Sequence, residues 1–160
     1  MIYYERDGLL IRDSVLADVA AMQDHLRRED AEEVIASGFA STEHALGYSF
    51  AVSAERFTVE QGGVPVAMFG CIPTGTFVCP SANVWLLGTE DLAKIKKSFV
   101  KLSRKWVANF VARHQVVFGF VDARYQRAVT WLESCGAVFE APQPHGEHGA
   151  AFVKFEIRRA

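Results

Sequence analysis

Apolar residues recur at helical spacing in several stretches of the chain, and the longest runs from Asp91 to His114. Its apolar positions lie three or four residues apart, as on one face of an α-helix: Leu92, Ile95, Phe99, Leu102, Trp106 and Phe110. The pattern predicts one long helix, with its lysines and arginines mostly off the apolar stripe.

Three shorter helices are predicted nearer the N-terminus. The first follows a strand-like run that starts at residue 9, and Ser14 or Asp13 can cap it. A second helix over residues 28–38 would end at Gly38. A third, over residues 41–50, would begin with Ser41 or Thr42 as its cap.

Strands are predicted from β-rich runs in the middle and at the end of the chain. Residues 55–72 contain two such runs joined by Gly62-Gly63, which indicates a hairpin because both turn positions can take positive φ. The runs at 82–89 and 116–122 are apolar on both faces, which is typical of central strands. Further strands are expected at 137–141 and 151–159.

Between residues 122 and 136 the pattern is again helical. Asp122 is predicted to cap this helix and Gly136 to end it. The resulting element order is a strand, two or three helices, three strands, a helix, a strand, a helix and two strands. This order predicts a mixed-sheet α/β (α+β) architecture, and we expect residues 1–160 to form a single domain.

Composition narrows the class of protein. Half of the 160 residues are hydrophobic and 22% are charged, as in an ordinary folded domain. A net charge of −2 gives no overall electrostatic case for a nucleic-acid partner, and no apolar run is long enough to predict a membrane span. The three cysteines have no CxxC spacing, which favours reduced thiols in a cytoplasm-like compartment.

Two segments carry a resemblance to a known family. The first is "LLIRDSVLADVAAM", and the second is "VDARYQRAVTWLESCGAVFE", in which Ala128 and Gly136 match a late motif. Together with the element order, they resemble the GNAT superfamily of acyl-CoA N-acyltransferases. The resemblance implies a GNAT fold with a central twisted, mostly antiparallel sheet flanked by helices, acetyl-CoA or CoA as cofactor, and an amine acceptor.

A narrower resemblance involves "VAMFG", "VWLLGT" and "PHGEHGAAF" as well. These strings are similar to GNAT-like proteins of T7-like podoviruses, which are described as internal virion protein A or acetyltransferase. That likeness implies a location in the cytoplasm of the infected bacterial host or in the virion. It also implies an alternative role, in which a catalytically inactive GNAT fold binds other virion proteins during virion morphogenesis.

The GNAT resemblance also implies where CoA would bind. Two mid-sheet strands splay apart in this family, and here they would be Val84–Leu87 and Val116–Val121. The backbone near Leu86 and Leu87 would polarise the thioester, and Gly88 to Ser98 would form the phosphate loop. The cofactor-binding residues implied in this way are Leu86, Leu87, Gly88, Thr89, Lys94, Lys96, Lys97, Ser98 and Arg127. If the protein is instead an inactive scaffold, Trp85 or Phe118 could fill the space between the strands.

The phosphate loop allows two interpretations. If Thr89 caps the helix, Glu90 and Asp91 suit the helix dipole but repel a pyrophosphate. If the helix instead begins at Ser98, three lysines lie at its N-terminus and favour a phosphate. A solvated lysine face would explain the same lysines without any ligand.

No residue matches the family's general acid, a tyrosine four residues before the late glycine. That position is Leu132, so Tyr125 is the remaining candidate in this segment. His44 and Glu43 could face a cleft or simply be solvated on a helix. His145 and His148 with Glu147 offer too few ligands at fixed spacing, so we expect no metal site.

Overall fold

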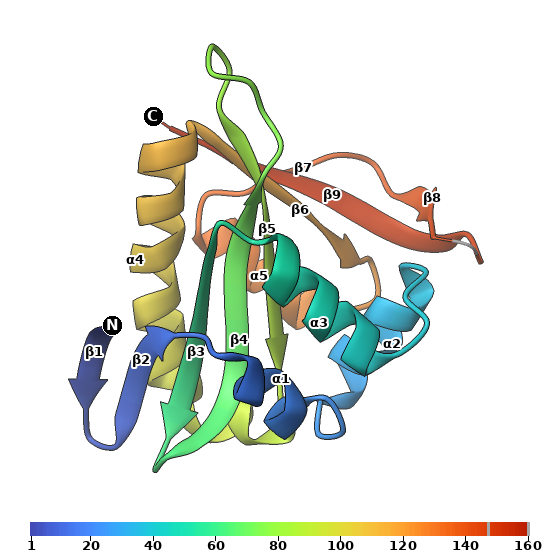
Figure 1. Ribbon diagram of the computed structural model, residues 1–160. Helices are drawn as coiled ribbons and strands as arrows, with labels where there is room; N and C mark the ends of the chain where they lie inside the picture. Colours follow the sequence, from blue (N-terminus) through green and yellow to red (C-terminus); the bar gives the residue numbers. More distant parts are fainter. Residues whose placement is uncertain (147, 160) are drawn as a thin grey trace. The chain divides into compact units, whose positions relative to one another are not determined.

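The computed structural model describes residues 1–146 and 148–159 (Figure 1). The chain is divided into two compact units. The first unit comprises Met1–Ile35, Phe39–Ile72 and Trp85–Lys96. The second comprises Ala36–Gly38, Pro73–Val84 and the chain from Lys97 onward. Strand β5 (Ser81–Gly88) therefore contributes its first half to the second unit and its second half to the first.

The first unit contains strands in the order β1-β2-β3-β4-β5, and the pairs β1–β2, β2–β3 and β3–β4 are antiparallel. The first four are β1 (Ile2–Arg6), β2 (Leu9–Asp13), β3 (Glu55–Gln61) and β4 (Val64–Pro73). The Gly62-Gly63 hairpin is confirmed, since both glycines have positive φ. Strand β1 was not predicted, although Asp7 and Gly8 also have positive φ and form the kind of two-residue turn that joins hairpin strands.

Three helices of the first unit pack on these strands: α1 (Leu16–Met22), α2 (Arg28–Ala36) and α3 (Thr42–Val52). Their inward residues share one apolar cluster with β4 and β5: Val19, Met22, Val34, Ala45, Leu46, Met68 and Leu87. Ser41 caps α3 as predicted, because its Oγ accepts a hydrogen bond from the His44 N–H at 3.0 Å.

The predicted cap of α1 is wrong. Val15 occupies the cap position, and its N–H donates to the Asp18 carboxylate at 2.8 Å. Asp13 is engaged elsewhere, since it accepts hydrogen bonds from the N-terminal amine at 2.7 Å and from the Tyr3 hydroxyl at 2.8 Å. Ser14 accepts a hydrogen bond from Thr58 at 2.8 Å. Long-range partners have thus taken both side chains that local sequence favoured as caps.

Asp18 is the centre of a buried polar network. Its two carboxylate oxygens accept hydrogen bonds from the Arg12 guanidinium at 2.7 and 2.8 Å, and the Thr58 hydroxyl donates to it at 2.7 Å. Arg12 also pairs with Glu60. Burial alone would raise the pKa of Asp18, but these hydrogen bonds outweigh burial and lower the pKa below its ordinary value.

The second unit contains β6 (Val116–Asp122), β7 (Val138–Phe139), β8 (Gln143–His145) and β9 (Ala150–Arg158). Strand β9 pairs antiparallel with all three others, and β6 also pairs with the first half of β5. Of the strand pairs in the described residues, the pair β5–β6 is parallel. The prediction of a mixed but mostly antiparallel sheet is confirmed.

Helix boundaries differ from the prediction at two places. The stretch expected to form one helix from Asp91 is a 3-10 helix, η1 (Glu90–Ile95), followed by α4 (Lys96–His114). Asp122 does not cap α5 (Gln126–Ser134); its carboxylate instead accepts hydrogen bonds from the backbone and guanidinium of Arg124. Gly136 does end α5, with φ +88°.

Across the described residues, no helix combines the length and the apolar character needed to cross a membrane.

Replacing Asp18 with Asn should lower the free energy of unfolding by roughly 3 kcal/mol at pH 7, because Arg12 then keeps its buried charge with a weaker partner. The lowered pKa of Asp18 means that its contribution is present above pH 4 and is lost as the pH falls below about 4. The difference between wild type and Asp18→Asn should therefore shrink at pH 3, as measured by denaturant unfolding. The exposed Asp24→Asn change is the control, and an equal loss in both variants would contradict the network.

Candidate functional site

Strand β6 is paired unequally along its two edges. On one edge, β9 pairs with it from Val116 to Asp122. On the other, β5 pairs with it only at Ser81–Asn83, which join Val116–Phe118. Beyond Phe118, the described residues provide no strand pair on the β5 edge of β6. The β5 edge of β6 is therefore open from Gly119 to Val121, and a ligand's amide groups can pair with it. The next residue is already engaged, since the Asp122 carbonyl accepts a hydrogen bond from the Tyr125 N–H at 3.0 Å.

Gly119 lies where this ladder ends. A Cβ atom on it would come within 2.7 Å of the Phe155 ring and 3.0 Å of the Val84 carbonyl oxygen. Only a residue without a side chain fits between these two neighbours. The close approach holds β6 against β9 and the first half of β5 just before its edge becomes open.

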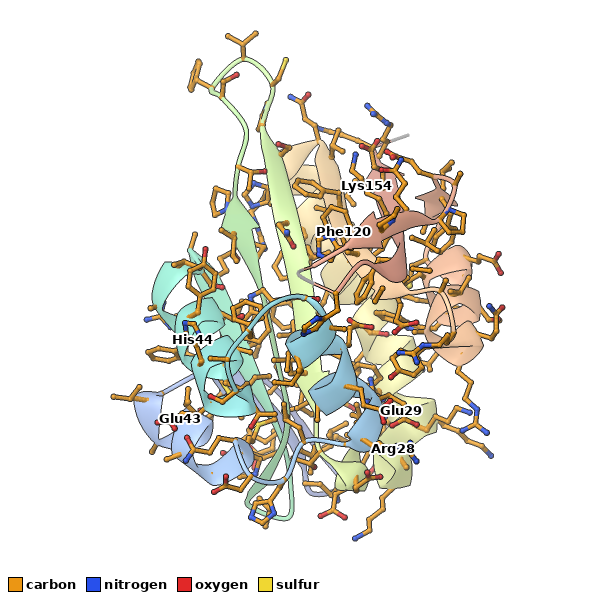
Figure 2. The ribbon with its side chains drawn as sticks, turned by 90° about the vertical axis from the view of Figure 1, so that its right-hand side faces the viewer. Arg28, Glu29, Glu43, His44, Phe120 and Lys154 are labelled. Atoms are coloured by element: carbon orange, nitrogen blue, oxygen red, sulfur yellow. The ribbon has the colours of Figure 1, made fainter. Side chains whose placement is uncertain are left out.

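Aromatic side chains lie on the open part of β6. Phe120 is 39% exposed (Figure 2). Its ring stacks on that of His145, with ring centroids 4.6 Å apart and planes 14° from parallel. His145 also contacts Phe152 at 5.0 Å. Phe118 lies two residues earlier on the same face of β6. The Lys154 ammonium nitrogen lies over its ring, 5.7 Å from the ring centroid.

The second half of β5 ends at Gly88 in the first unit. Both the N–H and the carbonyl of Gly88 have hydrogen-bond partners. The Gly88 N–H donates to the Asp30 carboxylate at 2.7 Å, and its carbonyl accepts from the Arg27 N–H at 2.9 Å. The next residue faces the opposite way, since the Thr89 N–H donates to the Val66 carbonyl on β4 at 2.9 Å.

Leu86 and Leu87 are the two residues predicted to polarise a thioester, and their backbone groups point to opposite edges of β5. Backbone groups of a strand point to alternate edges, so the Leu86 N–H points to the same edge as that of Gly88, away from β4. Leu87 shares the direction of Thr89, and its side chain is buried in the apolar cluster. Trp85 packs on the same cluster, and its indole N–H donates to the Ser53 hydroxyl at 2.8 Å.

Asp30, which is buried, forms an ion pair with the half-buried Arg27 beside Gly88. Asp30 is 7% exposed, and the Arg27 Nε lies 2.9 Å from its carboxylate. Burial raises the pKa of Asp30, and the charge of Arg27 opposes this effect. Sequence reasoning missed this pair, because Asp30 lies in a run of acidic residues in which nothing marks it as buried.

The predicted phosphate loop agrees with the first interpretation in one respect, since Thr89 occupies the cap position of η1, although its side chain makes no capping hydrogen bond. The second interpretation, with a helix that begins at Ser98, is wrong. The helix begins at Lys96, and Lys96 itself has helical dihedrals, so η1 continues into α4 without a break. Glu90 accepts a hydrogen bond from the Arg28 N–H at 3.2 Å, and Lys94 pairs with Asp91 at 2.7 Å. Lys96, Lys97 and Ser98 are exposed in the first turn of α4, which contains no acidic residue.

The candidate site residues of the α5 segment differ in burial. Tyr125 is half-buried at the cap position, with the Arg124 guanidinium 5.8 Å from its ring centre, and Arg127 is exposed in the first turn. Leu132 is only 5% exposed. The position at which the family carries its acid is thus part of the apolar core and supplies no proton.

The remaining candidates lie on surfaces. His44 and Glu43 are exposed in the first turn of α3, where the His44 ring lies edge-on to Phe39 at 5.6 Å. Figure 2 shows both side chains on this helix. His148 is exposed in a turn, and Glu147 lies outside the described residues.

Replacing Asp30 with Ala should cost roughly 3 kcal/mol of stability, because Arg27 keeps a buried charge and the Gly88 N–H loses its acceptor. The neighbouring exposed change Glu29→Ala should cost less than about 0.5 kcal/mol. Denaturant unfolding measures both. The double change Arg27→Met with Asp30→Leu should recover much of the loss if the buried charge dominates, and equal effects of Asp30→Ala and Glu29→Ala would contradict the assignment.

Comparison with solved structures identifies the fold. A spermidine N-acetyltransferase from Vibrio cholerae, solved with CoA and spermine, matches with a TM-score of 0.66 and 15% identity over 96% of each chain. A GNAT-family acetyltransferase from Bacillus anthracis matches with a TM-score of 0.66 and 15% identity, covering 99% of this chain and 98% of that one.

The ribosomal-protein-S18-alanine N-acetyltransferase from Escherichia coli matches with a TM-score of 0.67 and 13% identity, over 94% of this chain and 93% of that one. No protein-family model matches the sequence, and no curated protein does. The likeness covers nearly the whole chain at low identity, so it concerns the fold. The chain has the fold of the GNAT acetyltransferases, as its sequence segments predicted.

Proposed function

We propose that the protein is a GNAT-type acyltransferase that binds acetyl-CoA and transfers the acetyl group to an amine. The observation that carries this proposal is the open edge of β6 from Gly119 to Val121, beside a ladder with β5 that stops at Phe118. The pantetheine arm of CoA contains two amides, which pair with such an edge as a strand would.

The first unit supplies the Leu86 N–H, which points away from β4 and polarises the thioester carbonyl. Gly88 and Thr89 would contact CoA without donating backbone hydrogen bonds to it, because their N–H groups already donate to Asp30 and Val66. Leu87 holds the strand in the core, and Lys94 is paired with Asp91.

The phosphates of CoA would interact with the first turn of α4. Lys96, Lys97 and Ser98 are exposed there without an acidic neighbour in that turn, and Arg127 is exposed in the first turn of α5. Because η1 runs into α4, side-chain charge contributes more than free helical N–H groups in this proposal.

The reaction follows from general acyl-transfer chemistry. The neutral amine nitrogen forms a bond to the thioester carbon, the carbon–sulfur bond breaks, and the electron pair leaves with the CoA sulfur. The nitrogen loses a proton and the thiolate gains one. We propose Tyr125 as the acid, since Leu132 is buried and has no titratable group. Polyamines and protein N-terminal amines are the acceptors to test first, given what the compared enzymes are named for.

Calorimetric titration with CoA tests the cofactor. Lys97→Glu should weaken CoA binding at least about fivefold, roughly 1 kcal/mol, without changing the binding of pantetheine, which lacks the pyrophosphate. Lys105→Glu, an equal charge change further along α4, should change CoA affinity less than about twofold. Equal effects of the two variants, or no heat from CoA with the wild type, would contradict the proposed phosphate site.

Release of free CoA thiol from acetyl-CoA, followed with a thiol reagent and an amine panel, tests the activity. Tyr125→Phe should lower kcat roughly 100-fold with KM nearly unchanged, as expected for loss of a general acid. Tyr48→Phe, at an exposed tyrosine of α3, should leave kcat unchanged. Unaltered turnover in Tyr125→Phe would remove Tyr125 from the mechanism.

A second candidate function is favoured by the burial of Leu132. The same fold without chemistry could serve as a phage protein that binds other virion proteins, as the narrower sequence resemblance implies. In that case the wild type would release no thiol from acetyl-CoA with any amine of the panel.

A further inference from the structure

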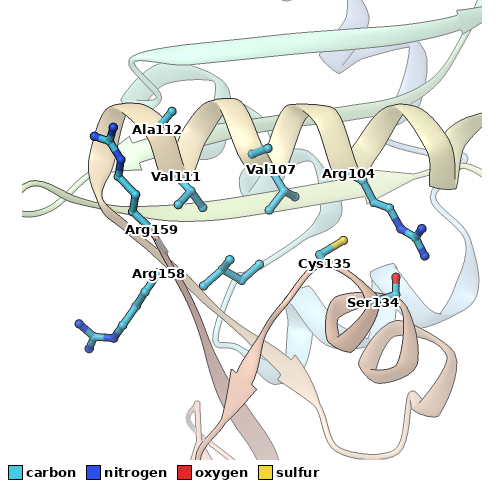
Figure 3. A pocket seen from close by; sticks show the side chains of 10 residues that line it. Arg104, Val107, Val111, Ala112, Ser134, Cys135, Arg158 and Arg159 are labelled. Carbon is cyan, nitrogen blue, oxygen red and sulfur yellow. The ribbon is translucent and has the colours of Figure 1, made fainter.

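A basic groove lies in the second unit, and none of its lining residues is among those proposed to bind CoA. Helix α4, the end of α5 and the end of β9 line it (Figure 3). Its lining residues are Arg104, Val107, Ala108, Val111, Ala112, Ser134, Cys135, Ile157, Arg158 and Arg159. The open depression has a volume of about 330 Å³.

The charged side chains that line the groove are all arginines. Arg158 pairs with Glu156 at 2.6 Å, whereas within the described part of the chain neither Arg104 nor Arg159 has an ion-pair partner. Helix α4 adds to this field, because six of its 19 residues are Lys or Arg and none is acidic. A whole-chain charge of −2 makes this concentration of positive charge a local feature.

The floor of the groove is apolar. Val111 and Ile157 are nearly buried at its base, with Val107, Ala108 and Ala112 beside them on α4. The Cys135 thiol also faces this region, and burial raises its pKa, so it remains a neutral thiol. An apolar floor with unpaired arginines matches a ligand that carries both acidic and apolar groups.

The spacing of Arg104 and Arg159 along the groove indicates how long a ligand that contacts both would be. In Figure 3, Arg104 lies at one end of the row of α4 residues and Arg159 lies near Ala112 at the other. Eight helical residues separate Arg104 from Ala112, a rise of about 12 Å. An extended peptide advances about 3.3 Å per residue, so acidic residues four apart span roughly the same distance.

We propose that this groove binds an extended acidic segment of a partner protein, with its apolar side chains on the floor and its carboxylates on Arg104 and Arg159. The lining residues favour a peptide over nucleic acid. They include no aromatic ring on which a base could stack, and a phosphodiester backbone would leave the apolar floor uncovered.

The test uses a fluorescein-labelled seven-residue peptide in which Glu alternates with Leu or Val, followed by fluorescence anisotropy. Arg104→Glu should weaken binding at least about tenfold. Lys105→Glu changes the same charge on the neighbouring residue, which does not line the groove, and should weaken it less than about threefold. A second matched pair tests the floor: Ala108→Glu should abolish binding and Asn109→Glu should not.

Two further probes separate the alternatives. A peptide with Ser in place of Leu and Val should bind at least about tenfold more weakly, because it leaves the floor uncovered. Double-stranded DNA of random sequence should not displace the labelled peptide at equal concentration. The proposal is overturned if the wild type does not bind the peptide, if Arg104→Glu and Lys105→Glu have equal effects, if the Ser peptide binds equally well, or if DNA displaces it. Sedimentation that showed the groove variants to alter self-association would instead assign it to a second copy of this chain.

Discussion

The unequal pairing of β6 is the constraint on which the proposed function depends. Seven residues of this strand pair with β9, and only three pair with β5. Backbone N–H and C=O groups need hydrogen-bond partners, and a strand edge without a neighbouring strand presents them to water or to a ligand. Gly119, the first residue beyond the ladder, fits tightly between Phe155 and Val84. An edge held so firmly on its other side is preorganised for an added strand-like ligand.

A second constraint acts at the end of β5. Gly88 is fixed by hydrogen bonds to Asp30 and Arg27, and a side chain on it would lie 2.6 Å from Leu92. This ion pair takes the N–H that a phosphate-binding glycine would otherwise offer. The proposal therefore gives the backbone N–H donor for CoA to Leu86 and the positive charge to the lysines of α4.

Two parts of the positively charged helix α4 take part in the proposals. Lys96 and Lys97 lie in its first turn, and Arg104 lies two turns later beside an apolar groove. The same helix buries Phe110 and Val111 on its apolar face. One amphipathic element thus supplies core packing, the proposed contact with CoA phosphates and the proposed docking of an acidic peptide.

The sequence by itself determined those features that depend on residues close together in the chain. The Gly62-Gly63 hairpin, the Ser41 cap and the Gly136 stop depend on φ preference or on a side chain three residues from its partner, and all three are confirmed. The family resemblance predicted the fold, and the compared structures confirm it.

Only the tertiary structure decided the features that join distant parts of the chain. Asp13, Ser14 and Asp122 were reasonable caps by sequence, but longer-range or competing hydrogen bonds took their side chains. The Asp30–Gly88 bond joins residues 58 positions apart, and the groove joins α4 to the end of β9. A pattern along the chain records which residues are apolar or charged, but burial and pairing across such separations are fixed only when the chain packs, because each group takes whichever partner the packed structure brings within reach.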